Sequence, residues 1–319
     1  MTTLTACGVA LAVLITTGAF AAEPTAPIPP PKPALVIPAD VELIKDVEYG
    51  KGGDVSLTLD ILRPKIQPKD PMPVVIFVHG GGFMSGSKQN GVRHLIPLAQ
   101  RGYFCATINY RLTDVAIFPA QIEDCKCAVR WARAHAREYN ADPKRIGAWG
   151  GSAGGTLVGL LGVTGGMKEF EGTGGWAKES SRVQAVCDWF GRMDIWKTAQ
   201  EEKARGVTKE TMVKGDISER LSALIGGVIW ENPYTCRWAS PITYVTKDDA
   251  PFLIMHGDKD DVVPMDQSVA FHEALRKAGV DSTLQVVKDV GHSFPGRPDL
   301  DKPVVEFFEK HLGKGSKQK

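Results

Sequence analysis

The segment Gly150-Gly151-Ser152-Ala153-Gly154 surrounds a serine hydroxyl with small residues. A short, mostly apolar run at 145–149 precedes it, and a second apolar run at 155–161 follows it. This order predicts a buried strand, a sharp turn and a buried helix, which is the context of a G-x-S-x-G nucleophile elbow. Small neighbours are needed because a larger side chain would collide with the strand or the helix. We therefore predict that Ser152 is a nucleophile.

A serine hydroxyl is a weak nucleophile at neutral pH, so it needs a base, an acid and a site for the oxyanion. The glycine turn at 79–82, His-Gly-Gly-Gly, directly follows the apolar run 74–78. Successive glycines let main-chain N–H groups converge on one small volume. We predict that the amides of Gly81 and Gly82, with that of Ala153, form the oxyanion hole. A merely flexible turn would not explain why a second glycine-rich turn also follows a buried strand.

Candidates for the base and the acid come later in the chain. His292 follows the apolar run 284–287, and the order serine, aspartate, histidine is the one expected for an elbow serine. Three aspartates after the apolar run 252–255 compete for the acid role: Asp258, Asp260 and Asp261. Asp260 is the candidate, but residue type alone does not separate the three. Solvated loop residues or turn caps would also have this composition.

The histidines outside these motifs need no catalytic role. His256 directly precedes the aspartate loop and is predicted to be a structural hydrogen-bonding residue. The others are expected on helical surfaces: His94, His135, His272 and His311.

Strands and helices alternate through most of the chain. Residues 47–49 and 57–62 flank a glycine-rich turn and predict an antiparallel hairpin. Continuous apolar runs predict strands buried on both faces at 74–78, 103–108, 146–149, 183–186, 252–255 and 284–287. Helical patterns occupy 122–139, 268–278 and 303–312. The chain is therefore predicted to be an α/β protein, a mostly parallel sheet with helices on both faces and an amino-terminal antiparallel hairpin.

Residues 168–238 break this alternation. The segment contains several glycines and tryptophans and a charged stretch at 201–210. Its position after the nucleophile suits a small cap or lid over the site. An ordinary helical excursion without a lid function is the alternative.

The first residues are typical of an exported protein. Residues 11–20 are a short apolar run, and Ala19-Phe20-Ala21 supplies the small residues of a signal-peptidase site. We predict a signal peptide at 1–21 and a secreted or periplasmic protein, although residues 1–10 lack the usual Lys or Arg. An uncleaved anchor, or a lipoprotein on Leu4-Thr5-Ala6-Cys7, is the alternative. The apolar run is too short to identify a membrane span.

The predicted signal peptide is followed by a proline- and alanine-rich stretch at 22–40. This composition favours an extended, semi-rigid linker. The linker is either a tether to the cell envelope or an unstructured leader. The catalytic domain is predicted at 41–313, with a short tail at 314–319.

The composition argues against several classes of partner. The net charge is +1 and 24% of residues are charged, which gives no electrostatic reason to expect nucleic acid or an anionic membrane as a partner. No stable membrane insertion is expected after cleavage of the signal peptide. Of the six cysteines, Cys7 lies in the predicted signal peptide. The remaining five cannot all pair and are predicted to be small buried side chains with at most one disulfide.

Taken together, these motifs resemble the α/β-hydrolases of the esterase and lipase kind that carry an HGGG motif. Within that group the chain is similar to carbohydrate esterases related to bacterial feruloyl and acetylxylan esterases. The resemblance covers residues 41–312 and rests on the segments 46–50, 59–61, 79–83, 109–112, 150–155, 256–264 and 291–294. It implies that Asp260 is the acid, because the acid of these relatives lies three residues before the valine of a Val-Pro pair, here Val263-Pro264.

The resemblance also implies a substrate site. Phe83 directly follows the HGGG motif, and Arg192 and Met193 follow the strand beyond the nucleophile. We expect these three side chains to contact substrate. Relatives often have Gly-Pro-Thr-Asp where this chain has Phe-Gly-Arg-Met-Asp at 190–194, so their acyl and alcohol preferences do not transfer directly.

The predicted chemistry is acyl transfer from Ser152 to water, which requires no metal and no organic cofactor. We predict a serine carboxylic-ester hydrolase acting on short-chain or aromatic acyl esters, carried by a small molecule or by plant polysaccharide. Two alternatives are a serine peptidase or amidase of the same fold and a non-catalytic binding protein. A binding protein is expected to lack a triad residue, and here each has a candidate.

Overall fold

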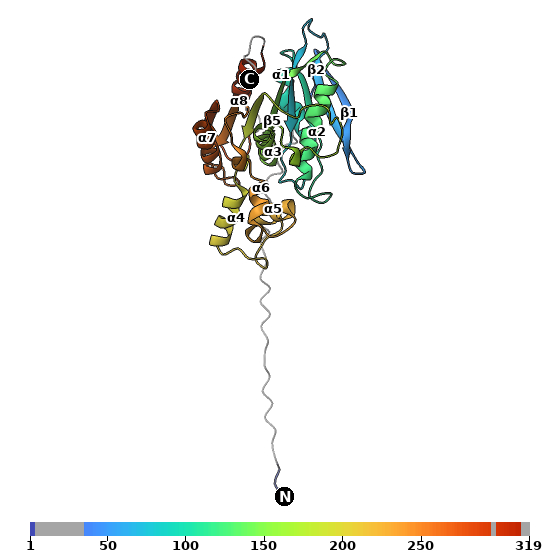
Figure 1. The fold of residues 1–319 in the computed structure, drawn as a ribbon. Helices are drawn as coiled ribbons and strands as arrows, with labels where there is room; N and C mark the ends of the chain where they lie inside the picture. Colours follow the sequence, from blue (N-terminus) through green and yellow to red (C-terminus); the bar gives the residue numbers. More distant parts are fainter. Residues whose placement is uncertain (4–34, 295–297, 314–319) are drawn as a thin grey trace. The chain divides into compact units, whose positions relative to one another are not determined.

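Eight strands form one sheet in the described part of the chain, in the order β1-β2-β4-β3-β5-β6-β7-β8 (Figure 1). The computed structural model describes residues 1–3, 35–294 and 298–313. The chain divides into a unit Met1–Leu35 and a unit Val36–Lys319, and the fold below is that of the second unit. All but the first three residues of the predicted signal peptide, most of the predicted linker and the predicted tail lie outside the described residues.

The sheet is mixed. Its strands are β1 (Val41–Gly52), β2 (Val55–Pro64), β3 (Met72–Val78), β4 (Phe104–Ile108), β5 (Ala141–Gly151), β6 (Ala185–Trp189), β7 (Phe252–Gly257) and β8 (Ser282–Val287). β1 pairs antiparallel with β2, and β2 pairs antiparallel with β4. The neighbouring pairs from β4 across to β8 are parallel. The predicted α/β fold with an amino-terminal antiparallel hairpin is confirmed.

β3 shows why the central strands are apolar without interruption. Its side chains alternate between two hydrophobic clusters, one containing Val74, Ile76 and Val78 and the other containing Val75 and Phe77. Successive side chains of a strand point to opposite faces. A strand covered on both faces must therefore be apolar at every position.

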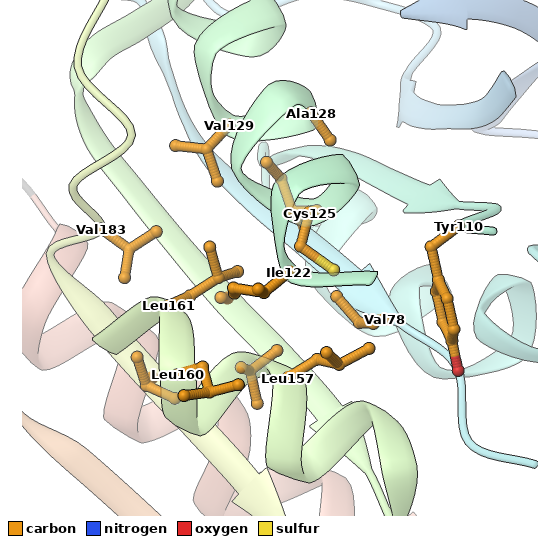
Figure 2. Close-up of a cluster of buried hydrophobic side chains, with 14 of the residues drawn as sticks. Val78, Tyr110, Ile122, Cys125, Ala128, Val129, Leu157, Leu160, Leu161 and Val183 are labelled. Atoms are coloured by element: carbon orange, nitrogen blue, oxygen red, sulfur yellow. The ribbon is translucent and has the colours of Figure 1, made fainter. Parts of the chain in front are cut away.

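Helices cover both faces of the sheet. The first cluster is closed by α2 (Ala120–Ala134), α3 (Ala153–Val163) and α7 (Asp266–Ala278), and the second by α1 (Gln89–Ala99) and α8 (Pro298–Leu312). Figure 2 shows residues of α2 and α3 that pack together over the sheet: Ile122, Cys125, Val129, Leu157, Leu160 and Leu161. This packing holds α3 rigidly behind the serine turn.

The predicted cap at 168–238 is not one continuous insertion. It contains β6, a central strand paired with both β5 and β7. The chain leaves the sheet after β6 and returns at β7, and this excursion carries α4 (Ile195–Ala204), α5 (Ile217–Ile225) and α6 (Pro233–Trp238), which gather at one end of the sheet (Figure 1). The apolar run 183–186 places the strand too early because Asp188, a buried acidic residue, interrupts the pattern of β6.

One histidine expected on a helical surface, His94, is half-buried against aromatic rings of the sheet. The ring of His94 on α1 stacks on Phe77 with 5.4 Å between centroids and meets Trp189 edge-on at 5.2 Å. Burial lowers its pKa to about 4, with the nearby Arg93 charge acting in the same direction. Helical periodicity placed His94 on α1 but does not show these contacts with aromatic side chains of the sheet.

Five cysteines belong to the described residues, and all are buried free thiols: Cys105, Cys125, Cys127, Cys187 and Cys236. Burial raises the pKa of the Cys127 thiol to about 11 and that of Cys236 to about 12. These side chains therefore pack as small apolar groups, in agreement with the sequence. In the same part of the chain, no helix has the length and hydropathy needed to cross a bilayer.

Candidate active site at the carboxyl edge of the sheet

Ser152 lies between the end of β5 and the start of α3, on a strained turn. Its backbone φ of 57° is unusual for a residue with a side chain, and such strain typically costs about 1–3 kcal/mol. Two main-chain hydrogen bonds hold the turn, from Ser152 N to Trp189 O at 2.9 Å and from Thr156 N to Ser152 O at 3.0 Å. A Cβ on Gly154 would lie 2.1 Å from Val78 O, so this neighbour must be glycine. The turn leaves the serine half-buried.

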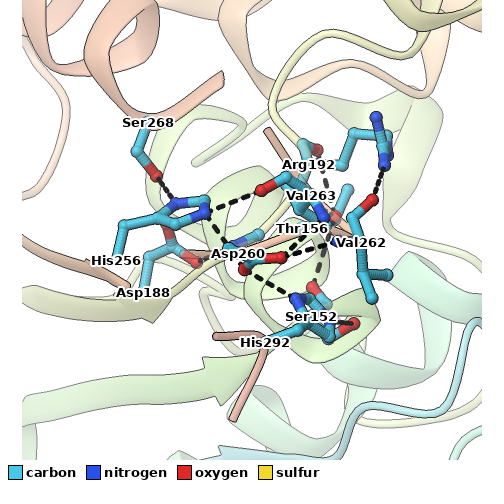
Figure 3. A network of polar contacts seen from close by, with 11 residues as sticks. Ser152, Thr156, Asp188, Arg192, His256, Asp260, Val262, Val263, Ser268 and His292 are labelled. Carbon is cyan, nitrogen blue, oxygen red and sulfur yellow. Dashed lines mark hydrogen bonds and ion pairs between the residues drawn. The ribbon is translucent and has the colours of Figure 1, made fainter. Parts of the chain in front are cut away.

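The structure brings Ser152, Asp260 and His292 together (Figure 3). His292 Nε2 lies 2.8 Å from Ser152 Oγ, and His292 Nδ1 lies 2.7 Å from Asp260 Oδ2. The three residues follow β5, β7 and β8, and the carboxyl ends of parallel strands meet at one edge of the sheet. Because a carboxylate only accepts, Nδ1 carries the proton and Nε2 is free to accept from the serine hydroxyl. A neutral His292 in this tautomer is arranged as a general base.

The structure also separates the three aspartates. The Asp260 side chain is 0% exposed; its Oδ1 accepts from Val262 N at 2.9 Å and Val263 N at 2.8 Å. Asp258 instead accepts from Asp289 N, and Asp261 is exposed. Burial by itself would raise the pKa of Asp260, but hydrogen bonds from His256, His292 and Val263 N hold it well below its usual range. Asp260 is therefore an ionised carboxylate aimed at His292.

His256 supplies a further donor to this acid. Its Nε2 lies 2.9 Å from Val263 O and 3.1 Å from Asp260 Oδ2, while its Nδ1 lies 2.7 Å from Ser268 Oγ (Figure 3). Both neighbours of Nε2 only accept, so Nε2 carries the proton and Nδ1 accepts from the Ser268 hydroxyl. A neutral imidazole satisfies all of these contacts, and the predicted role of a structural hydrogen-bonding residue fits them.

Asp188 is a buried acid that sequence reasoning missed. Its Oδ1 accepts from Gly191 N at 3.0 Å, and among the described residues its Oδ2 has no hydrogen-bond partner. Burial raises its pKa to about 7, against opposing contributions from His256 and Gly191 N. The available signal was an acidic residue two positions after the predicted buried strand 183–186.

The glycine turn passes directly beside the serine. A Cβ on Gly80 would lie 3.2 Å from Ser152 Cβ. The carbonyl of Gly81 accepts from Met84 N at 3.2 Å, Ser85 N at 3.1 Å and Ser85 Oγ at 3.1 Å. In a planar trans peptide the next N–H points opposite to the carbonyl. These bonds therefore fix the direction of the Gly82 N–H.

The oxyanion hole is predicted to consist of the N–H groups of Gly81, Gly82 and Ala153. None of the three donates a hydrogen bond to an acceptor in the part of the chain that the structure describes. Ala153 is the first residue of α3, where helical N–H groups have no partner within the helix. The positive end of the helix dipole adds to its attraction for an anion.

The three predicted substrate contacts do not present open side chains. Phe83 is 4% exposed, Arg192 is 4% exposed and Met193 is 0% exposed. Arg192 instead donates to Val262 O at 2.8 Å and Thr198 Oγ1 at 2.7 Å, which ties the excursion to the acid loop. Burial lowers the pKa of Arg192 to about 10. The contact of these three side chains with substrate therefore stays a prediction, because position in a motif does not show which way a side chain turns after a strand ends.

Two residues near the site carried no sequence signal. The ring of Phe190 lies 4.8 Å from the ring of His292 and backs the imidazole. Arg220 on α5 reaches the glycine turn, where its Nη1 lies 3.5 Å from Gly81 O. Both contacts join segments that lie far apart in the chain.

A separate cavity of about 260 Å³ lies at the opposite, amino edge of β6, β7 and β8. Its lining includes Arg182, Asp249, Asp281 and His311. Because the serine turn lies at the carboxyl edge, this cavity is not part of the triad site.

The chain is similar to several known proteins. Residues 59–275 match the BD-FAE family model. Esterase LipC of Mycobacterium tuberculosis is 36% identical over 226 residues, which cover 70% of this chain and 53% of LipC. Esterase LipQ of the same organism is 32% identical over 73% of this chain and 53% of its own length. The chain thus spans about half the length of these curated relatives.

Solved structures give a fuller overlap. A truncated carbohydrate esterase from gut microbiota is 32% identical, with a TM-score of 0.73, and the alignment covers 86% of this chain and 97% of that one. A butyrate-bound thermophilic esterase from Thermogutta terrifontis is 27% identical, with a TM-score of 0.65 over 84% of this chain and 91% of that one. The similarity therefore extends over nearly all of both solved folds.

Proposed function

The chain belongs to the BD-FAE family, and from that premise we propose that it hydrolyses carboxylic esters through an acyl-enzyme on Ser152. The observation that carries the proposal is the continuous hydrogen-bonded path from Ser152 Oγ through His292 to Asp260, with bonds of 2.8 and 2.7 Å. A half-buried serine with an aligned imidazole is suited to nucleophilic attack.

In the first half of the cycle, His292 Nε2 accepts the hydroxyl proton while Ser152 Oγ attacks the ester carbonyl carbon. The resulting imidazolium is stabilised by Asp260, whose low pKa keeps it ionised. His292 then gives the proton to the departing alcohol oxygen, and the acyl group stays on Ser152. Water repeats the same steps and releases the acid.

The tetrahedral oxyanion needs donors that do not have to reorient during the reaction. In this proposal the N–H groups of Gly81, Gly82 and Ala153 supply them. The bonds that Met84 N and Ser85 make to Gly81 O support the assignment for Gly82, since they hold that peptide in one orientation. Loss of one such donor typically lowers kcat by about 10²–10³.

For the substrate we infer a short acyl ester, or an aromatic one, carried by a plant polysaccharide or a small molecule. Two comparisons support it, since one similar solved structure is described as a carbohydrate esterase and another holds butyrate. Export follows in the same proposal from the predicted signal peptide at 1–21.

A panel of esters tests the function. Wild type, Ser152→Ala and the surface control Ser180→Ala are compared on acetyl, butyryl, palmitoyl and feruloyl esters. We expect Ser152→Ala to lose about 10³-fold or more in kcat with an unchanged melting temperature, and Ser180→Ala to match wild type. Turnover retained in Ser152→Ala would overturn the proposal. Cleavage of matched amides as fast as esters would instead favour a peptidase or amidase.

A further inference from the structure

Arg220 lies against the glycine turn. Its Nε donates to Gly215 O at 2.7 Å, and its Nη1 lies 3.5 Å from Gly81 O. A Cβ on Gly82 would be only 2.4 Å from Nη1, so the guanidinium rests directly on that glycine. The excursion between β6 and β7 therefore delivers a cation to the peptide that carries a proposed oxyanion donor.

This cation has no protein counter-ion among the described residues. Six other arginines contact a carboxylate: Arg63, Arg101, Arg111, Arg130, Arg145 and Arg205. The acidic groups nearest to Arg220 in sequence are engaged elsewhere, since Asp216 accepts from Glu219 N and Glu219 accepts from Gly215 N. A guanidinium has five N–H donors, and the two hydrogen bonds above use only two of them. Arg220 is half-buried, so part of its surface is exposed to solvent.

The loop that joins the glycine turn to α5 carries exposed apolar side chains. The loop 113–118 runs from the glycine turn to α5, with Thr113 N bonded to Phe83 O and Phe118 N bonded to Leu224 O. Within it Val115 is 55% exposed and Ile117 is 50% exposed.

Resting on the ester-hydrolase function above, we propose that Arg220 is a specificity-determining residue that pairs with a carboxylate on the substrate. The preferred substrates are acidic esters, in which a carboxylate group lies a few bonds from the scissile carbonyl. A bidentate guanidinium–carboxylate pair fixes orientation as well as position, so it also places the carbonyl beside the glycine turn. The carboxylate can belong to the acyl group or to the alcohol.

Two matched pairs of substrates separate these sources. For the acyl side, the 4-nitrophenyl monoester of succinic acid is compared with 4-nitrophenyl butyrate. For the alcohol side, 4-acetoxybenzoate is compared with 4-acetoxybenzamide. The uncatalysed rate is subtracted in each case, and kcat/KM is measured for wild type, Arg220→Gln and Arg220→Lys. Arg276→Gln on α7 removes the same charge from an exposed position outside the site.

We expect the acidic-to-neutral ratio of kcat/KM to fall at least tenfold in Arg220→Gln for one of the pairs. Arg220→Lys should keep part of the ratio because it keeps the charge but not the fork geometry. Arg276→Gln should keep the wild-type ratio.

An equal loss on acidic and neutral esters in Arg220→Gln would overturn the proposal, because a residue that only braces the glycine turn would affect both alike. An unchanged ratio in both pairs would overturn it as well. Failure of the ester-hydrolase function itself is distinguishable, since Ser152→Ala would then retain turnover of the neutral esters.

Discussion

His256 and His292 approach the same oxygen of Asp260, at 3.1 and 2.7 Å. The other oxygen accepts from the N–H groups of Val262 and Val263. Donors on both sides fix the carboxylate plane, and with it the imidazole ring that faces Ser152. The geometry of the base therefore depends on a second histidine that never reaches the serine.

Replacing His256 by Phe removes one of the two imidazole donors to Asp260. The carboxylate becomes more basic and holds a proton on His292 more strongly, so the acid limb of kcat/KM should move to higher pH. Loss of a hydrogen bond to a charged group, about 1.5–3 kcal/mol, corresponds to a fall of roughly tenfold to hundredfold in kcat/KM. The measurement is a pH–rate profile with the melting temperature alongside.

His256→Gln keeps an N–H donor and should recover part of the loss. His272→Phe on α7 is the matched control for replacing a histidine by Phe. If His256→Phe lowers only the melting temperature and leaves the pH profile in place, His256 is a packing residue and the positioning role is excluded.

The pH dependence of the wild type follows from the base. An imidazole accepts the serine proton only when neutral, so kcat/KM should fall as the pH is lowered into the acidic range. The depressed pKa of Asp260 keeps that carboxylate ionised across this range, so the slope should correspond to one proton. A profile that stays flat down to about pH 5 in a folded protein would contradict the assignment of His292.

Asp188→Asn tests the buried acid. Its pKa is raised to about 7 in the fold, so the folded state holds the proton more tightly than the unfolded chain. The stabilisation from this proton is complete below about pH 4 and is lost as the pH rises to about 7. The increase in the free energy of unfolding that Asp188→Asn gives over wild type should therefore be larger at pH 8 than at pH 5, by on the order of 2 kcal/mol.

Unfolding in urea at the two pH values measures this difference, with Asp54→Asn in the exposed β1–β2 turn as the control. Asp188→Asn should change turnover far less than His256→Phe, since Asp188 makes no contact with Ser152 or His292. If the free energy of unfolding depended on pH identically in wild type and Asp188→Asn, the raised pKa of the buried Asp188 carboxyl would be contradicted.

Gly81→Ala tests the proposed oxyanion turn. A Cβ at Gly81 would lie 2.1 Å from the main-chain oxygen of Ser85, so the turn has to move and the Gly82 N–H moves with it. We expect kcat to fall by about 10²–10³. Gly279→Ala provides the control, because Gly279 has a positive φ of 87° but no atom within 4 Å of the added Cβ. That variant should lose about 1 kcal/mol of stability and no activity. Equal kcat values for the two variants would contradict the proposed role of the glycine turn in stabilising the oxyanion.

The strands and the triad were accessible from sequence because each leaves a local pattern. β3 and β7 are continuous apolar runs, and the serine, the aspartates and His292 each follow such a run. Prediction of strand bounds was less accurate at β6, where the buried Asp188 interrupts the apolar pattern and the strand was predicted too early. The end of a helix is also set by nearby residues, but it leaves only a weak pattern in the sequence. α2 ends at Ala134, although its apolar pattern continues to 139.

The side chains around the site were not accessible in this way. Arg192 and Met193 follow a strand that was predicted, yet both turn inward. Arg220 meets Gly81 across 139 positions of sequence, and no local periodicity encodes that contact. The choice of Asp260 over its neighbours required either a resemblance or the hydrogen bonds themselves.

The serine and its base are 140 positions apart, and they follow strands that are not adjacent in the sheet. β6 and β7 must both be in register before β8 can bring His292 over Ser152. Refolding experiments can exploit this dependence. Circular dichroism would register helices that form early, whereas regained turnover would report only molecules whose sheet is assembled through to β8. Activity is thus the stricter measure of complete folding, and a fragment ending before β8 should be inert however helical it is.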